Sequence, residues 1–114
     1  MIREVIAYKD NFIKFYKAQD LKVQTKMEYV LDLVRYERNI PVKFLKHLES
    51  SDGIFEIRVI TTFKSIRILC FFDDGNLVVL TNCFLKKSQK TPSSEIKLAE
   101  KLKKEYLLEK EGGK

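Results

Sequence analysis

The sequence is poor in the residues that most often carry acid–base, metal or disulfide chemistry, since it has one histidine and two cysteines. The single histidine, His47, excludes catalysis by a histidine pair, and its charged surroundings predict a surface position. Cys70 and Cys83 fit no zinc-binding spacing and lie in apolar segments, so we expect buried, reduced thiols rather than a disulfide. No metal or cofactor is expected.

Long apolar runs are also missing. A membrane-spanning helix needs about 20 consecutive apolar residues, and no segment of the chain approaches that length. The first four residues, Met-Ile-Arg-Glu, introduce charge at once, which is unlike a secretory signal peptide. The sequence shows no internal repeat, linker or low-complexity block. These absences predict a cytoplasmic protein that does not associate with a membrane.

The composition is that of a basic, folded domain. The chain has 114 residues, of which 45% are hydrophobic, with a net charge of +6 and a pI of about 9.3. Residues 1–108 are expected to form a single domain, and residues 109–114 a polar, frayed tail. The positive charge favours an anionic partner such as nucleic acid, although composition alone fits ordinary basic proteins equally well.

Hydrophobic periodicity predicts a strand and two helices in the first part of the chain. Residues 3–8 suit a short strand, and residues 10–16 suit a short helix. After Asp20, a candidate N-cap, apolar side chains recur at helical spacing, and this amphipathic helix should end before Pro41. Residues 41–51 are mixed in character and suggest one further helical turn.

The second part of the chain predicts strands and a last helix. Three apolar segments have the length and composition of strands: residues 54–61, 65–72 and 77–85. Asp74-Gly75 is a strong hairpin signal, and Thr91 with Pro92 predicts the N-cap and first position of a helix. The order β-α-α-β-β-β-α indicates an α+β domain with a small, mainly antiparallel sheet, an N-terminal helical hairpin and a C-terminal helix.

The most informative segment is residues 84–92, Phe-Leu-Lys-Lys-Ser-Gln-Lys-Thr-Pro. Three lysines with no acid between them follow directly on a predicted strand and precede a predicted helix. Positive charge is therefore concentrated at a sheet edge and held between two ordered elements. This arrangement suits a polyphosphate partner, with RNA as the first candidate. The alternative is a solvated cluster of lysines, which is the usual fate of such runs.

Three segments resemble the RelE/ParE toxin superfamily, and most closely its HigB-like, phage-derived branch. They are residues 53–58 (GIFEIR), 66–72 (IRILCFF) and 82–92 (NCFLKKSQKTP), the last followed by Glu95, Ile96 and Ala99. The resemblance implies a RelE-like fold and a type II toxin that enters the ribosomal A site, cuts mRNA there and inhibits translation. It also implies a cognate antitoxin as partner, usually a helix-turn-helix, HigA-like protein.

The same resemblance indicates the site residues. Cleavage by the 2′-hydroxyl needs a proton acceptor, stabilisation of charge on the phosphate and help for the leaving oxygen. Arg67 is expected to contact the scissile phosphate and Arg58 to position the backbone, because forked donors suit phosphate. A lysine with a lowered pKa or Glu56 would accept the proton, and the sequence leaves both open. The candidate catalytic residues are Glu56, Arg58, Arg67 and Lys87, and the candidate RNA-binding residues are Lys86, Gln89, Lys90 and Thr91.

Other interpretations remain open at this point. An ion pair of Glu56 with Arg58 or Arg67 across strands would by itself account for arginines within apolar strands, without a functional role. A ParE-like inhibitor would bind DNA gyrase without any chemistry, and an RNA-binding module without catalysis would bind RNA with a steep salt dependence. The lysines and the two strand arginines favour the endonuclease, because a gyrase inhibitor has no need of a phosphate-binding groove.

Overall fold

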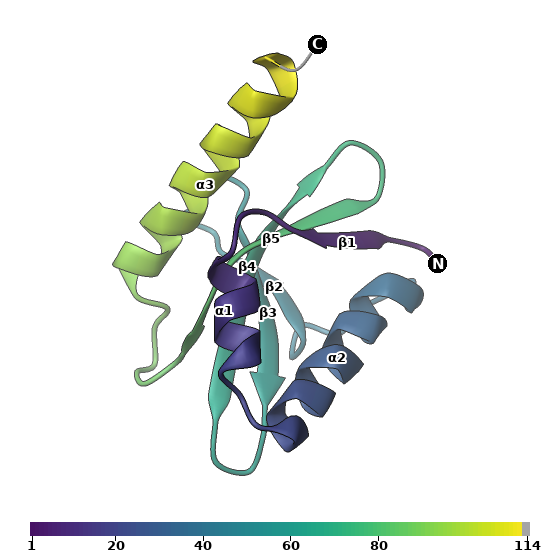
Figure 1. The fold of residues 1–114 in the computed structure, drawn as a ribbon, viewed down its shortest axis with the longest axis vertical. Helices are drawn as coiled ribbons and strands as arrows, with labels where there is room; N and C mark the ends of the chain where they lie inside the picture. The colour runs from purple at the N-terminus through teal and green to yellow at the C-terminus, as the bar shows by residue number, and fades with distance from the viewer. Residues whose placement is uncertain (113–114) are drawn as a thin grey trace.

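The computed structural model describes residues 1–112, in which a five-stranded mixed sheet carries helices on both faces (Figure 1). The spatial order of the strands is β1-β5-β4-β3-β2, with β1 parallel to β5 and all other neighbours antiparallel. The strands are β1 (Glu4–Ala7), β2 (Leu45–His47), β3 (Phe55–Ile60), β4 (Ser65–Asp73) and β5 (Leu77–Leu85). The predicted α+β class with a mainly antiparallel sheet is confirmed.

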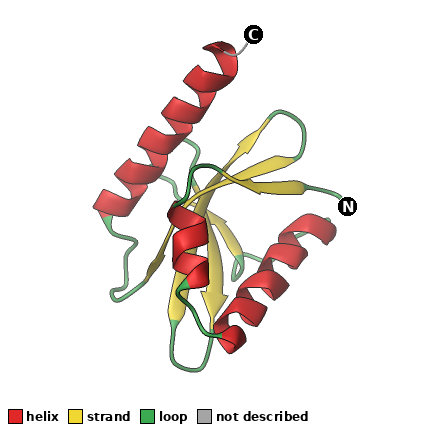
Figure 2. Ribbon diagram, viewed as in Figure 1, coloured by secondary structure: helices red, strands yellow, loops and turns green. Residues whose placement is uncertain are grey.

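Helices α1 (Asn11–Lys17) and α2 (Leu21–Tyr36) pack on one face of the sheet, and α3 (Ser93–Gly112) packs on the other (Figure 2). Asp20 caps α2, because its carboxylate accepts a hydrogen bond of 2.9 Å from the backbone nitrogen of Val23. Within residues 1–112, no helix is both long and apolar enough to cross a membrane. The apolar stripe predicted for α2 is buried against the sheet and consists of Val23, Met27, Val30, Leu31 and Val34.

Residues 41–45 make a single turn, in which the backbone nitrogen of Leu45 donates to the carbonyl of Pro41 at 3.2 Å, but the segment before β3 then continues as a strand that the sequence did not predict. Leu45 pairs with Ile57, and His47 pairs with Phe55, which makes β2 the edge strand beside β3. A helix of a few residues is marginal in water, whereas a strand of the same length gains ladder hydrogen bonds from a neighbour that is already ordered. This tertiary pairing decides the conformation.

The C-terminal helix is longer than expected and continues to Gly112. Its last turns are held by side chains, since the hydroxyl of Tyr8 donates to Glu109 Oε1 at 2.7 Å and Lys110 Nζ lies 3.0 Å from Asp73 Oδ2. Residues 109–112, which the sequence placed in a polar tail, continue this helix. The last two residues of the chain lie outside the described part.

α3 covers only a part of its sheet face. A hydrophobic cluster joins the sheet to the helix and contains Ile54, Leu69, Phe71, Val79 and Ala99. Further along β3 and β4, towards the hairpin that connects them, the same face becomes polar. This polar end of the sheet is where the predicted functional side chains gather.

Candidate nucleic-acid interface

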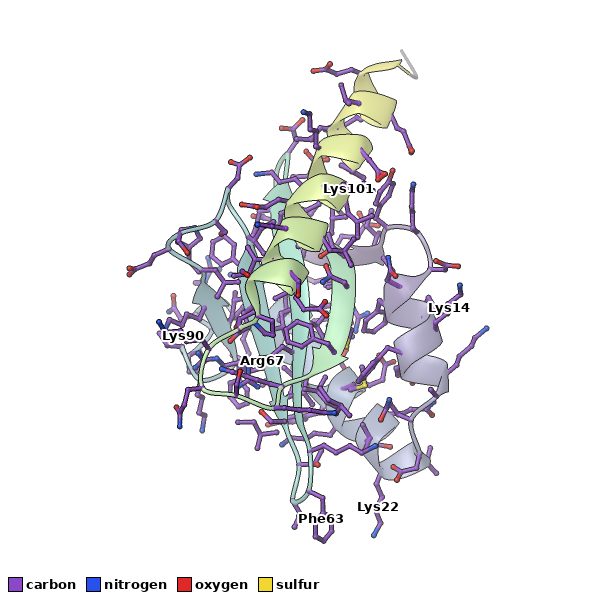
Figure 3. All side chains as sticks on the ribbon, turned by 90° about the vertical axis from the view of Figure 1, so that its left-hand side faces the viewer. Lys14, Lys22, Phe63, Arg67, Lys90 and Lys101 are labelled. Atoms are coloured by element: carbon purple, nitrogen blue, oxygen red, sulfur yellow. The ribbon has the colours of Figure 1, made fainter. Side chains whose placement is uncertain are left out.

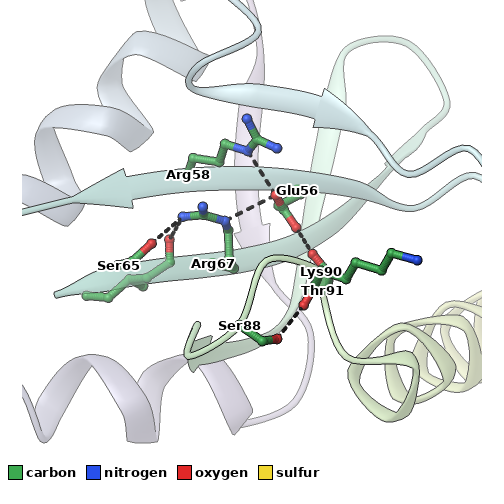
Figure 4. Close-up of polar contacts among 8 residues, drawn as sticks. Glu56, Arg58, Ser65, Arg67, Ser88, Lys90 and Thr91 are labelled. Atoms are coloured by element: carbon green, nitrogen blue, oxygen red, sulfur yellow. Dashed lines mark hydrogen bonds and ion pairs between the residues drawn. The ribbon is translucent and has the colours of Figure 1, made fainter.

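The polar end of the sheet lies beside an extended connection rather than beneath a helix. Because side chains alternate along a strand, Arg58 of β3 and Arg67 of β4 point to the face that carries α3. Residues 86–91, called the lysine segment below, connect β5 to α3 and lie next to these side chains (Figure 4). Strand alternation and one connection thus build the site.

Glu56 is the centre of the site, and none of its surface is exposed. Its Oε1 accepts a hydrogen bond of 2.9 Å from Arg58 Nε and lies 3.1 Å from Arg67 Nε (Figure 4). Its Oε2 accepts a hydrogen bond from the hydroxyl of Thr91. The prediction that Thr91 caps the last helix is wrong, since α3 begins at Ser93 and the Thr91 hydroxyl donates to Glu56 instead. A buried carboxylate without a hydrogen-bond donor costs more free energy than an uncapped helix end.

Arg58 and Arg67 stand directly opposite each other on β3 and β4. Like charges in this position repel, and the carboxylate of Glu56 between them offsets the repulsion. Burial raises the pKa of Glu56, but hydrogen bonds from Thr91 and Arg58 and the charge of Arg67 outweigh it, so the pKa falls below its ordinary value. The structural ion pair predicted from the sequence is confirmed, and it includes both arginines instead of one.

These contacts leave part of each guanidinium group available. Arg67 Nη1 donates to Ser65 Oγ at 3.0 Å and to the carbonyl of Ile66 at 3.1 Å. Burial lowers the pKa of Arg67, yet an arginine remains charged at any physiological pH. In the part of the chain that the structure describes, Arg67 Nη2 and both Nη atoms of Arg58 make no hydrogen bond. Planar donors of this kind bind phosphate oxygens in pairs.

Lys86 is the least exposed lysine of the lysine segment. Its backbone nitrogen donates to the carbonyl of Ser65 at 2.7 Å, which joins the start of the segment to β4. Burial lowers the pKa of Lys86, and the neighbouring charge of Arg67 lowers it further. Lys87 and Lys90 are exposed, so their ammonium groups face solvent at the rim of the site.

Two clefts meet at Lys86 and Gln89. The larger has a volume of about 540 Å³ and contains Glu56 and Arg58 in its wall, and the smaller has a volume of about 450 Å³ and contains Arg67. Positive charge dominates both walls, so an anion is their natural ligand. The cationic residues are Lys46, Arg58, Arg67, Lys86, Lys87 and Lys90, and the carboxylates are Glu49 and Glu56.

The structure brings all the predicted site residues into the walls of these two clefts. The predicted residues in these cleft walls come from distant parts of the sequence, since Glu56 and Thr91 are 35 positions apart. The residues so placed are Glu56, Arg58, Arg67, Lys86, Lys87, Gln89, Lys90 and Thr91.

Lys46 is a further cleft residue that the sequence did not indicate. It pairs with Glu56 in the β2–β3 ladder and therefore lies on the same face of the sheet. Its neighbour His47 pairs with Phe55 and packs its ring against the phenyl ring at 5.0 Å, so the imidazole points to the opposite face and is exposed. The surface position predicted for His47 is confirmed. Only knowledge of β2 and its register would have revealed Lys46.

Comparisons with known proteins agree with this architecture. The model of a family described as phage-derived protein Gp49-like (DUF891) matches residues 14–104. No curated protein matches the sequence significantly. The chain resembles the intact E. coli RelBE toxin–antitoxin complex with a TM-score of 0.55 and 9% identity, over 75% of this chain and 99% of that one. It resembles the archaeal RelE–RelB complex of Pyrococcus horikoshii OT3 with a TM-score of 0.56 and 17% identity, over 80% and 100% of the two chains.

Proposed function

Because this chain belongs to the phage-derived Gp49-like family and has the fold of RelE, we propose that it is the toxin of a type II toxin–antitoxin module. Its activity is ribosome-dependent cleavage of mRNA, which inhibits translation. The observation that carries this proposal is the pair of arginines that Glu56 holds face to face, with free guanidinium nitrogens beside a lysine-lined cleft.

The proposed reaction is attack of a 2′-hydroxyl on the adjacent phosphate. The 2′-oxygen loses its proton and forms a bond to phosphorus, the bond from phosphorus to the 5′-oxygen breaks, and that oxygen takes up a proton from solvent, so a cyclic phosphate and a 5′-hydroxyl result. We assign Arg67 to the scissile phosphate and Arg58 to the adjoining backbone, because both line the clefts and keep Nη donors that are not used within the described part of the chain. Lys87 and Lys90, at the exposed rim, would pair with flanking phosphates.

We assign the proton acceptor to Lys86. Burial and the charge of Arg67 lower its pKa, which increases the fraction of neutral amine available to take a proton. Glu56 suits a positioning role better, because both of its carboxylate oxygens are occupied by Arg58, Arg67 and Thr91. Of the acceptors that the sequence left open, a lysine is thus the better candidate, and we assign the role to the less exposed Lys86 instead of Lys87, the lysine expected from the sequence.

Two partners follow from the proposal. The ribosome would align the mRNA in the cleft, where the protein supplies positive charge and hydrogen-bond donors for phosphates. The two similar structures are complexes of RelE with RelB, and by extension an antitoxin would neutralise this toxin. We expect that antitoxin to be an acidic, helix-turn-helix, HigA-like protein, because it must cover a basic surface.

Primer extension on a reporter mRNA after induction of the protein tests the proposal. A translated reporter is compared with the same reporter lacking its start codon. Cuts confined to the translated message are expected, whereas cuts in both would mean a free ribonuclease. Growth arrest without cuts, accompanied by DNA damage signalling, would favour a gyrase inhibitor.

Two substitutions connect this readout to the site. Arg58→Lys keeps the charge but loses the forked donors that would position the adjoining backbone, and it should reduce cleavage by about 10²-fold, the cost of a misplaced reacting group. Arg38→Lys is the matched control, because it makes the same change at an exposed arginine that follows the C-terminal end of α2, away from both clefts. Circular dichroism of both variants checks that the fold is retained.

A further inference from the structure

The tip of the β3–β4 hairpin carries an aromatic side chain that the proposed cleavage site does not use. Phe63 is 94% exposed, the highest value among the large hydrophobic residues that the structure describes, and Figure 3 shows it projecting from the end of the hairpin. Ile60, at the end of β3, is also largely exposed. Such a side chain gains no free energy from burial in the core, so its apolar surface is available for contact with a partner.

The hairpin tip is well ordered by hydrogen bonds. The backbone nitrogen of Thr61 donates to the carbonyl of Lys64 at 2.9 Å, and the backbone nitrogen of Lys64 donates to Thr61 Oγ1 at 3.0 Å. Lys64 Nζ donates to Gln19 Oε1 at 2.8 Å, which ties the tip to the connection between α1 and α2. A ligand of Phe63 therefore loses little free energy in ordering the loop that presents it.

Lysines surround this aromatic ring. A cleft of about 440 Å³ beside Phe63 is lined by Lys22, Lys26 and Lys64, and Figure 3 shows Lys22 at the same end of the molecule. The carboxylate in this lining, that of Asp20, already caps α2 through the backbone nitrogen of Val23. The local charge therefore favours an anionic ligand.

We propose that the hairpin tip is a second contact for single-stranded RNA, in which Phe63 stacks on a base and Lys22, Lys26 and Lys64 pair with phosphates. The inference rests on the proposed function, because it extends the RNA path beyond the cleavage site. An aromatic platform bordered by cations is the combination by which proteins bind single strands without reading their sequence.

The tip is continuous with the cleavage site along β4. Ser65 follows Phe63 by two residues, a span of at most about 7 Å, and it lines the smaller cleft. Its side chain accepts a hydrogen bond from Arg67, and its carbonyl accepts one from the backbone of Lys86. A strand of RNA that leaves the smaller cleft past Ser65 and turns around the hairpin tip therefore meets Phe63, and then the lysines of α2 on the other face of the sheet.

The absence of tryptophan from the chain makes the proposal directly measurable. Phe63→Trp introduces a single fluorescent indole at the tip, and the probe is a short 2′-O-methyl oligoadenylate, which has no 2′-hydroxyl to react. Binding should quench the fluorescence, with an apparent affinity that falls steeply as salt is raised. The matched control is Tyr36→Trp, because Tyr36 is 57% exposed at the far end of α2, and its fluorescence should stay unchanged.

Phe63→Leu distinguishes a base from an apolar protein segment as the occupant. Leucine keeps the apolar bulk but has no aromatic face, so the oligoadenylate should bind about 5- to 100-fold more weakly than to the unchanged protein. Equal binding by Phe63→Leu, or no quenching of Phe63→Trp at saturation, would overturn the proposal and favour a protein partner at the tip. Since the probe cannot be cleaved, this result is independent of the primer-extension test of the proposed function.

Discussion

The hydroxyl of Thr91 donates a hydrogen bond to Oε2 of Glu56, so a single contact joins the lysine segment to the central carboxylate of the sheet. Lys86 and Gln89, which precede Thr91 in that segment, form the boundary between the two clefts. The position of these side chains over the arginines therefore depends on how firmly Thr91 is held.

Thr91→Val should destabilise the protein, because valine has the shape of threonine but leaves one oxygen of a buried carboxylate without its donor. A hydrogen bond to a charged group contributes about 1.5–3 kcal/mol, and we expect a loss of this size in the free energy of unfolding, measured with urea. Thr91→Ser is the control and should behave almost as the unchanged protein. A valine variant of full stability would show that the contact does not support the segment.

Glu56→Gln should be among the most damaging single changes in the sheet. It removes the charge that separates Arg58 from Arg67 and leaves the buried Arg67 facing the half-buried Arg58 without a counterion. Loss of one partner of a buried ion pair costs about 3–5 kcal/mol, and we expect about 3 kcal/mol in chemical denaturation. Glu49→Gln, an exposed carboxylate in the wall of the same cleft, should change stability by less than about 0.5 kcal/mol. Equal effects would contradict the central role given to Glu56.

The pH dependence of stability should report the same carboxylate. The pKa of Glu56 is lowered below 4.5 in the folded state, so the folded protein binds fewer protons than the unfolded chain in that range. Its stabilising contribution is complete above pH 4.5 and is lost as the pH falls through the folded pKa. The difference in unfolding free energy between the unchanged protein and Glu56→Gln should therefore shrink on acidification. The pKa of Asp73 is also lowered, mainly by the Tyr106 hydroxyl. Because both proteins contain Asp73, its contribution cancels in the difference between their unfolding free energies.

Lys86 should titrate below the ordinary lysine value of 10.5, because burial and the charge of Arg67 both disfavour its ammonium form. The shift of its ε-carbon resonance with pH measures this directly in isotopically labelled protein. Arg67→Gln removes the largest of the neighbouring charges that lower this pKa and should move the titration back towards 10.5. An unchanged midpoint in that variant would mean that the two side chains do not interact, and a midpoint at 10.5 in the unchanged protein would contradict the assignment of Lys86 as proton acceptor.

The sequence predicted those parts of the fold that depend on neighbouring residues. The buried stripe of α2 from Val23 to Val34 follows from spacing alone, and the β4–β5 hairpin follows from Asp74-Gly75. The strand β2 was not predictable in this way, because three residues carry too little pattern and their conformation depends on pairing with β3.

The same distinction between local and long-range features applies to the candidate site. Arg58, Arg67 and the lysines could be grouped in advance, since each lies in a segment with a family resemblance. The partner of Thr91 and the inclusion of Lys46 could not, because both depend on strand register and on the path of a connection. The residue types of the site can thus be identified from the sequence, whereas the contacts between their side chains across the sheet can be identified only from the structure.

β1 is the first strand to be synthesised, yet its neighbour in the sheet is β5, where Glu4 stands opposite Leu77. During translation the N-terminal segment therefore emerges long before the surface on which it pairs, and closing so long a loop is a late and slow event in folding. In the same way, the carboxylate of Glu56 receives its hydrogen bond only after Thr91 has been synthesised. A ribosome that makes this protein carries an incomplete sheet and an unassembled arginine pocket through most of the synthesis, which separates in time the making of the chain from the formation of its site.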